Sequence, residues 1–285
     1  MGIDLNQLTL DTNPANAANH KKLLYINMHE FLTGRTGHPK LEELRKFRYA
    51  HRGFHDKPQV PENSLGAFIR AIRNHFGAEL DVHLTKDGKL VVFHDDTTDR
   101  TAGVPGTIED RTLEEVRELR LEGTNEKVPL FNEVLTLFED SGYPLIIELK
   151  VVRGNYKELA KAVCERLDSY KGLFCIESFN PRAIAEVRKL RPDIVRGQLA
   201  SDFIYEPGTC PKNTRWLLTN LKMNVLSKPD FVAYDFRFRN NRAFLNEIKK
   251  GVQGVAWTLR DPEDFLEAES LGYLCIFEKF DPNKL

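Results

Sequence analysis

Short apolar runs alternate with amphipathic stretches from Phe47 almost to the end of the chain, and this alternation restricts the possible folds more than any other feature. Runs of β-branched and aromatic residues that are separated by helix-length segments are typical of βα units around a parallel sheet. The runs that we interpret as strands are 47–51, 79–84, 89–94, 144–149, 173–179, 194–199, 231–236, 252–258 and 273–277. They number one more than the eight strands that close a parallel barrel.

A hairpin between 79–84 and 89–94 explains the additional run. Only residues 85–88 separate the two runs, whereas parallel neighbours need a crossover of a dozen or more residues. The Asp87-Gly88 pair is a strong hairpin turn. The remaining runs predict an irregular (β/α)8 TIM barrel with a β-hairpin excursion after the second strand. An open doubly wound sheet is the alternative, but no G-x-G-x-x-G follows the first strand.

Capping residues mark several helix starts between these strands. Apolar residues recur at helical spacing over 65–76, directly after the polar Asn63-Ser64. Further starts are predicted from a capping box or from a cap residue followed by proline. They are Thr112-x-x-Glu115, Asn155-x-x-Glu158, Asn180-Pro181 and Asp261-Pro262, and weaker helical stretches lie at 214–222 and 241–250.

The length of the chain favours one large catalytic domain with an N-terminal extension. Barrels of this class span roughly 200–250 residues, and the regular pattern begins only near residue 46 of the 285. The preceding segment is polar apart from one amphipathic stretch at 23–31. We therefore predict an extension over 1–45 that packs on the outside of a barrel domain over 46–285.

Charge and cysteine content argue against several classes of partner. Forty-one basic and 42 acidic residues leave a net charge of -1, so no global field attracts nucleic acid or an anionic membrane. The first residues lack the basic and apolar regions of a secretory signal, and no apolar run approaches the roughly 20 residues of a spanning helix. Without C-x-x-C spacing, the cysteines are expected to be reduced; they are Cys164, Cys175, Cys210 and Cys275. These features predict a cytoplasmic protein with no stable membrane anchor and no nucleic-acid partner.

Carboxylates in and at the ends of the predicted strands form a candidate metal site. In a parallel barrel the functional side chains lie where the strands end. Glu79 and Asp81 are two residues apart and share one face of a strand, while Glu148 interrupts the apolar run 145–147. A site made only of oxygen ligands favours one Mg²⁺ or Ca²⁺ ion over zinc. The alternative is that these carboxylates pair with arginine or lysine side chains inside the barrel.

Two histidines at strand ends are the candidate acid and base. His51 ends the first run and His94 ends the second arm of the hairpin, and imidazole can give or take a proton near neutral pH. Arg52 could bind phosphate oxygens with its guanidinium fork, or it could form a salt bridge with Glu62. His83 lies on the strand face of the carboxylates, and we expect a structural role for it rather than direct catalysis.

These residues belong to a series of motifs that resembles the glycerophosphodiester phosphodiesterase family. The series runs from about residue 47 nearly to the end, in the family's order and with near-family spacing. Its segments are His51-Arg52-Gly53, Pro61-Glu62-Asn63-Ser64, 79–88, 91–97, Asp99-Arg100-Thr101, Ile147-Glu148-Leu149-Lys150, Ser178-Phe179-Asn180 and Ala256-Trp257-Thr258. The sequence departs from the family at Ser64, which replaces the usual threonine, and at 276–280, where the family usually has Thr-Asp-x-Pro.

The resemblance implies a TIM barrel that hydrolyses glycerophosphodiesters to an alcohol and sn-glycerol 3-phosphate with one divalent cation, Mg²⁺ or Ca²⁺. The implied site comprises catalytic His51 and His94, metal-binding Glu79, Asp81 and Glu148, phosphate-binding Arg52 and Lys150, Glu62 near the metal, and Trp257 lining the alcohol or glycerol side. The small-molecule substrate would be the only partner that these motifs imply.

The mechanism that we expect has two steps. One histidine deprotonates the glycerol 2-hydroxyl, which attacks phosphorus, while the other protonates the leaving oxygen, and water then opens the cyclic phosphate. Direct attack by water would use the same residues. A lysophospholipase D-type or phosphoinositide-type phosphodiesterase could also use this site, and a barrel that only binds a phosphate ligand is a third possibility.

Overall fold

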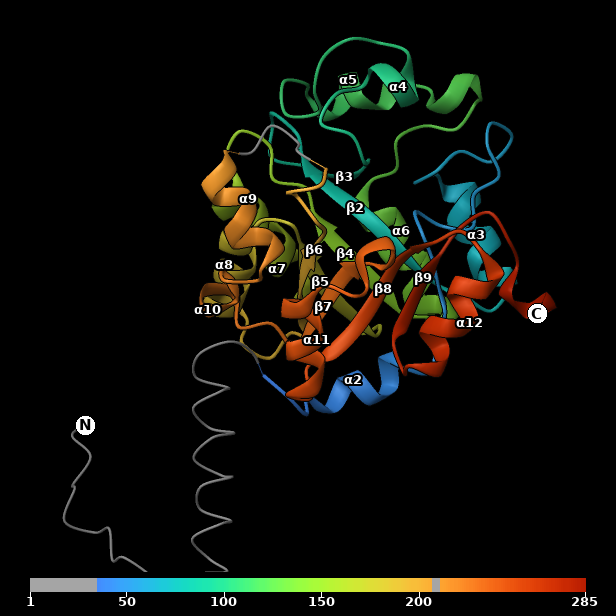
Figure 1. Cartoon of the computed structure of the whole chain (residues 1–285). Coiled ribbons are helices and arrows are strands. Elements are labelled where there is room, and N and C mark those ends of the chain that lie inside the picture. Colours follow the sequence, from blue (N-terminus) through green and yellow to red (C-terminus); the bar gives the residue numbers. More distant parts are fainter. Residues whose placement is uncertain (1–34, 207–210) are drawn as a thin grey trace, which may run out of the picture.

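A closed barrel of parallel strands forms the centre of the protein (Figure 1). The computed structural model describes residues 35–206 and 211–285. The barrel strands follow the order β1-β9-β8-β7-β6-β5-β4-β2, and pairing of β1 with β2 closes the ring. They are β1 (Tyr49–Ala50), β2 (Gly77–Leu84), β4 (Leu145–Leu149), β5 (Phe174–Ser178), β6 (Arg196–Ala200), β7 (Phe231–Asp235), β8 (Gln253–Leu259) and β9 (Leu274–Phe277). The predicted TIM barrel is therefore confirmed.

The remaining strand, β3 (Leu90–Val92), is the second arm of the predicted hairpin. It pairs antiparallel with the end of β2, with Val82 opposite Val92. The turn closes through hydrogen bonds at Thr85, and Gly88 adopts a φ of 72° that side chains disfavour. Because β3 pairs outside the ring, the chain returns to the mouth of the barrel at His94 without using a barrel strand.

Helices surround the barrel, and several begin at the predicted capping residues. Thr112 and Glu115 form the capping box of α5, while Asn180 and Asp261 cap α8 and α12 ahead of a proline. Asn155 precedes α7, but its side chain accepts a hydrogen bond from the Val152 N–H instead of capping the helix. The helices are α2 (Pro39–Leu44), α3 (Leu65–Arg73), α4 (Asp99–Ala102), α5 (Leu113–Glu118), α6 (Phe131–Ser141), α7 (Tyr156–Leu167), α8 (Pro181–Leu190), α9 (Lys212–Thr219), α10 (Asn224–Ser227), α11 (Arg242–Lys249) and α12 (Pro262–Ser270), with 3-10 turns η2 (Leu121–Gly123), η3 (Phe236–Phe238) and η4 (Pro282–Lys284).

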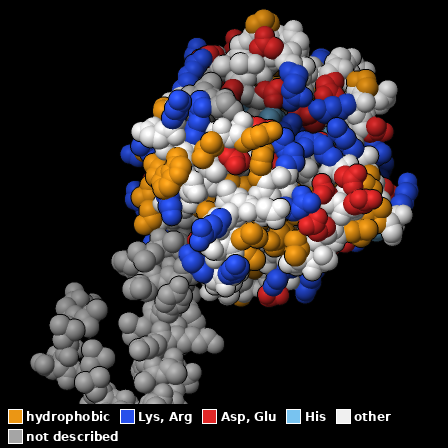
Figure 2. All heavy atoms as spheres, in the orientation of Figure 1, with side chains coloured by type: hydrophobic (Ala, Val, Ile, Leu, Met, Phe, Trp, Pro, Cys, Tyr) orange, Lys and Arg blue, Asp and Glu red, His pale blue; other side chains and the backbone are white. Residues whose placement is uncertain are grey.

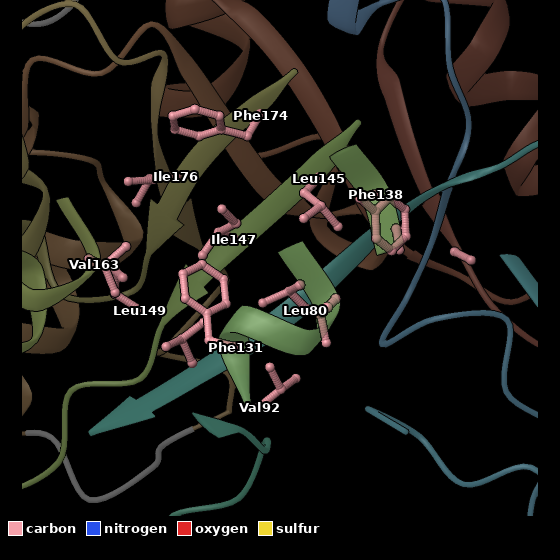
Figure 3. Close-up of a cluster of buried hydrophobic side chains, with 14 of the residues drawn as sticks. Leu80, Val92, Phe131, Phe138, Leu145, Ile147, Leu149, Val163, Phe174 and Ile176 are labelled. Atoms are coloured by element: carbon pink, nitrogen blue, oxygen red, sulfur yellow. The ribbon is translucent and has the colours of Figure 1, made fainter. Parts of the chain in front are cut away.

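The outer face of the barrel packs against these helices. Alternate residues of a strand point to opposite sides, so Leu80 and Ile147 face outward into a large buried apolar cluster. Phe131 and Phe138 of α6 lie in the same cluster, as Figure 3 shows. Burying such side chains stabilises the fold by roughly 1.5–3 kcal/mol each.

The interior of the barrel is apolar at one end and polar at the other. Tyr49, Ile146 and Phe231 point inward and form a second cluster, which Leu41 and Leu44 of α2 complete. Figure 1 shows α2 at the end of the barrel opposite to α4 and α5. Because apolar side chains fill the end next to α2, the polar inward-facing residues are concentrated at the carboxyl ends of the strands.

The predicted N-terminal extension is described only in its last part. Residues 1–34, including the amphipathic stretch at 23–31, lie outside the described residues. Within 35–45, the Arg35 guanidinium donates two hydrogen bonds to Asp230, at 2.7 and 2.8 Å. Together with α2, this contact joins the described end of the extension to the barrel.

Surface charge, helix hydrophobicity and the cysteines are the features on which the predicted cellular environment of the protein is based. On the face seen in Figure 2, acidic and basic side chains are interspersed. A helix able to span a membrane is not found among residues 35–206 and 211–285. Cys164, Cys175 and Cys275 are free and buried, and Cys210 lies outside the described residues.

Candidate active site

A pocket at the carboxyl ends of the strands brings together most of the predicted site residues. Every second residue of a strand points into the barrel. The inward-facing Tyr49 of the apolar layer is therefore followed by an inward-facing His51, and Ile146 is followed by Glu148. The pocket is lined by His51, Arg52, Glu79, His94, Glu148, Glu177, Phe179, Leu199, Trp257 and Ile276. Segments that are more than two hundred residues apart in the sequence therefore meet at one site.

Glu79, Asp81 and Glu148 form a buried carboxylate cluster. One oxygen from each lies within 4.8 Å of the others, a spacing that could hold a metal ion. The Arg52 N–H donates to Glu79 Oε2 at 3.0 Å, and Asn63 Nδ2 donates to Asp81 Oδ2 at 2.8 Å. Asp81 Oδ1 is buried without a hydrogen-bond partner in the described part of the chain. Three carboxylates with an unsatisfied oxygen among them fit the needs of a divalent cation.

Burial and mutual repulsion perturb the titration of this cluster. Burial, followed by the charge of Asp81, raises the pKa of Glu79 well above its usual value. Burial also raises the pKa of Glu148 to about 7, although Lys150 opposes the shift. For Asp81, the effect of burial is outweighed by His94, Lys150 and Arg52, which lower its pKa. Burial and mutual repulsion therefore disfavour full ionisation of the cluster, an effect that a bound cation would offset.

The raised pKa of Glu148 predicts a pH-dependent stability difference between the protein and its Glu148→Gln variant. The folded state binds the Glu148 proton more tightly than the unfolded state, so the contribution of Glu148 to stability falls as the pH rises from 4.5 to about 7. In a chelating buffer, the free energies of unfolding of the variant and the wild type should be equal near pH 4.5. Above about pH 7, the free energy of unfolding of the variant should be larger by an amount on the order of 3 kcal/mol. Urea unfolding across this pH range measures the difference. A difference in the free energy of unfolding that does not change with pH would contradict the raised pKa of Glu148.

Glu278 holds His51 in one orientation. The Nδ1 atom of His51 lies 2.6 Å from Glu278 Oε2, and Arg260 donates to the other oxygen of Glu278 at 2.6 Å. With Nδ1–H donating to the carboxylate, His51 Nε2 points toward the cluster, 3.9 Å from Glu79 Oε2. Burial, then the charge of Arg52, lowers the pKa of His51 to about 3 despite Glu278. A neutral His51 with a free Nε2 can accept a proton.

His94 has an equivalent arrangement on the other side of the pocket. Its Nδ1 lies 2.5 Å from Asp95 Oδ1, and Arg100 donates to Asp95 Oδ2 at 2.6 Å. Burial lowers the pKa of His94, although Asp81 and Asp95 oppose the shift. Each histidine is thus oriented by a carboxylate that is itself held by an arginine, which leaves both Nε2 atoms available for proton transfer.

Two basic side chains, Lys150 and Arg52, lie next to the carboxylate cluster. Lys150 Nζ lies 3.1 Å from Glu148 Oε1 and 3.6 Å from Asp81 Oδ1. Arg52 Nη1 donates to Glu62 at 2.9 Å, which is the salt bridge that the sequence left open, while Arg52 Nε is buried without a hydrogen-bond partner in the described chain. The carboxylates are therefore partly paired inside the barrel.

The backbone after His51 takes a shape that brings Arg52 close to Glu79. Arg52 has a φ of 53° and Gly53 a φ of 76°. A Cβ at Gly53 would lie 2.8 Å from the Ala67 Cβ, so only glycine fits against α3. This close turn allows the Arg52 N–H to reach the carboxylate cluster.

Glu62, His83 and Trp257 lie at the edges of the site. Glu62 is buried and contacts three cations, Arg52, Lys57 and Arg100. His83 is fully buried between Glu109 and the carbonyl group of His94, a packing position consistent with the expected structural role. Trp257 lines the pocket with Phe179, and their rings are 5.4 Å apart at 80°.

Glu278 and Glu177 are the site residues that sequence reasoning missed. Glu278 directly follows the last strand, in the segment that departs from the family pattern. Glu177 interrupts the apolar run Phe174-Cys175-Ile176, which is the same signal that identified Glu148. Both could have been found by searching every strand end for an acidic residue.

Comparisons with known proteins support these observations. The model of the glycerophosphoryl diester phosphodiesterase family matches residues 51–280. The glycerophosphodiester phosphodiesterase of Caldanaerobacter subterraneus subsp. tengcongensis is 34% identical over 227 residues, which cover 75% of this chain and 86% of that protein. The enzyme of the same name from Bacillus altitudinis is 30% identical, with 73% and 92% coverage.

A solved structure extends the likeness to the fold. The Oleispira antarctica phosphodiesterase, determined in complex with its product sn-glycerol-3-phosphate, aligns with a TM-score of 0.71 at 25% identity and covers 87% of this chain and 97% of its own. The expected family and the expectation of an enzyme are confirmed. This chain belongs to the glycerophosphoryl diester phosphodiesterase family of enzymes.

Proposed function

We propose that this protein is a metal-dependent phosphodiesterase that hydrolyses glycerophosphodiesters to an alcohol and sn-glycerol 3-phosphate. One observation carries the proposal: two histidines, each oriented by a carboxylate, line a pocket together with Glu79 and Glu148 of the carboxylate cluster. The family match and the product bound in the Oleispira antarctica relative support the same reaction. We further propose that 46–285 is the catalytic domain and 1–45 an extension packed on it.

Glu79, Asp81 and Glu148 would hold one divalent cation. Oxygen donors favour Mg²⁺ or Ca²⁺, and such an ion supplies positive charge that stabilises a phosphodiester in its transition state. The unsatisfied Asp81 Oδ1 and the raised pKa of Glu148 support this assignment. Glu62 would keep Arg52 and Arg100 in place beside this cluster.

Arg52 and Lys150 bind the phosphate oxygens in this proposal. Arg52 has a buried Nε that lacks a hydrogen-bond partner among the described residues, and Lys150 carries a firmly held proton because Glu148 and Asp81 raise its pKa against the effect of burial. Both groups can therefore donate to the equatorial oxygens as charge develops there.

His51 and His94 move the protons. One Nε2 accepts the proton of the glycerol 2-hydroxyl, whose oxygen attacks phosphorus, while the other imidazolium protonates the departing alcohol oxygen. Water then opens the cyclic phosphate with the roles exchanged, and direct attack by water would need the same two groups. Trp257 and Phe179 form the wall against which the glycerol or alcohol group lies.

A substrate screen separates this function from lysophospholipid hydrolysis. We expect sn-glycerol 3-phosphate release from glycerophosphocholine, glycerophosphoethanolamine, glycerophosphoglycerol and glycerophosphoinositol with Mg²⁺ or Ca²⁺. For lysophosphatidylcholine we expect a kcat/KM at least about tenfold lower. Faster release of choline from lysophosphatidylcholine would instead favour a lysophospholipase D-type enzyme. The cytoplasmic location expected from the cysteines stays a prediction.

A further inference from the structure

The pocket is also lined by Glu177, a carboxylate outside the proposed metal site to which the proposed reaction gives no role. Glu177 lies on β5 and is 1% exposed. Its Oε2 has no hydrogen-bond partner within the described chain, although the residue lines the pocket. A buried acceptor without a donor is costly to keep. Because Glu177 lines the pocket, a bound ligand can supply the missing donor.

Glu177 adjoins the carboxylate cluster but is not one of its members. In the parallel ladder Asp81 lies opposite Glu148, and Glu148 lies opposite Glu177, so the three side chains occupy one layer of the barrel. The three oxygens with metal-ligand spacing come from Glu79, Asp81 and Glu148. Glu177 thus borders the cluster on the side that leads toward β6, β7 and β8.

The opposite border of Glu177 is aromatic and apolar. Trp257, Phe179 and Leu199 line the same pocket. The Trp257 Nε1–H is also buried without a partner among the described residues. The pocket therefore offers one acceptor and one donor beside apolar surface, and a hydroxyl group on a short carbon chain satisfies both kinds of atom. A group that lacks a donor proton would leave Glu177 unpaired.

We propose that Glu177 accepts a hydrogen bond from the terminal hydroxyl of the glycerol group, with Trp257 Nε1–H donating to the same group, and that Glu177 thereby selects substrates whose terminal hydroxyl is free. This inference rests on the proposed function, because it assigns the glycerol group of the same substrate to this end of the pocket. A lysophospholipid carries an ester oxygen at that position, which has no proton to donate to the carboxylate. Glu177 is in this account a specificity-determining residue.

The test compares glycerophosphocholine with its 1-deoxy analogue, which keeps the 2-hydroxyl and lacks only the terminal one. The wild type should prefer glycerophosphocholine in kcat/KM by roughly 10- to 100-fold, the range expected when a buried polar group is left without its hydrogen-bond partner. In Glu177→Leu this preference should fall to about threefold or less, and Glu177→Gln, which keeps an acceptor and the side-chain volume, should lie between the two. Most of the loss should appear in KM.

Control measurements distinguish recognition of the terminal hydroxyl by Glu177 from a role in metal binding. Glu247→Gln replaces a buried carboxylate on α11, outside the pocket, whose Oε2 also lacks a hydrogen-bond partner among the described residues. This substitution should leave the preference unchanged. The rise in melting temperature on adding Ca²⁺ should be the same in Glu177→Gln as in the wild type. Competitive inhibition of the wild type by sn-glycerol 3-phosphate should exceed that by its 1-deoxy analogue, a comparison that needs no variant.

Three outcomes would overturn the assignment. A wild type that does not distinguish the two substrates or the two inhibitors excludes recognition of the terminal hydroxyl. An equal loss on both substrates in the variants, or a lost Ca²⁺ effect, would place Glu177 with the metal cluster. A wild type that hydrolyses no glycerophosphodiester would instead refute the proposed function, and the inference with it.

Discussion

Replacing His94 or His51 by alanine is expected to lower kcat for glycerophosphocholine hydrolysis by about 10²–10⁴ in each case. Each imidazole donates Nδ1–H to a carboxylate, so that Nε2 is the atom left for proton transfer. Initial rates of sn-glycerol 3-phosphate release measure the effect. His75→Ala is the matched control, because His75 is exposed and contacts Tyr143 away from the pocket.

The same variants also identify the role of each histidine. A substrate with a p-nitrophenol leaving group needs little protonation of the departing oxygen, so the variant that lacks the general acid should recover most of its rate on that substrate. The variant that lacks the general base should not recover. If either alanine variant retained near-wild-type turnover on glycerophosphocholine, that histidine would have no part in proton transfer.

Asp81→Asn is expected to lower activity by about 10³ or more, because it removes a central ligand oxygen of the metal site while preserving side-chain volume. Thermal unfolding provides an independent readout. A cation at 100 times its dissociation constant stabilises the wild type by about 2.7 kcal/mol, and this stabilisation should be absent in the variant. Asp110→Asn alters an exposed pair with Arg153 and should change neither quantity. Unchanged stabilisation by Mg²⁺ and Ca²⁺ in Asp81→Asn would exclude the proposed ligand set.

The strands and the main part of the site could be predicted from sequence because both depend on local patterns. Each apolar run overlaps one observed strand, with ends that differ by no more than two residues, and the Asp87-Gly88 turn placed the hairpin. Inward-facing carboxylates were recognisable where they interrupted apolar strands, as at Glu148. The alternation of a strand fixes which face a side chain occupies, and the barrel fixes which ends meet.

Partners that lie far apart in the sequence could not be predicted in the same way. Glu278 and His51 are 227 residues apart, and their hydrogen bond depends on β9 pairing beside β1. The sequence also left two interpretations of Arg52. The structure shows the salt bridge with Glu62, while Arg52 Nε lies 3.6 Å from Asp81 Oδ2 and has no hydrogen-bond partner among the described residues. Which of several nearby cations pairs with which carboxylate depends on the three-dimensional geometry of the site. Residue type and spacing in the sequence do not specify that geometry.

The most direct test of the account is the release of sn-glycerol 3-phosphate from glycerophosphocholine by the purified protein, measured before chelation, after EDTA treatment, and after Mg²⁺ or Ca²⁺ is added back. We predict release that EDTA abolishes and that at least one of the two cations restores. Release that continues unchanged after complete removal of divalent cations, or no release with either cation, would contradict a metal-dependent glycerophosphodiester phosphodiesterase.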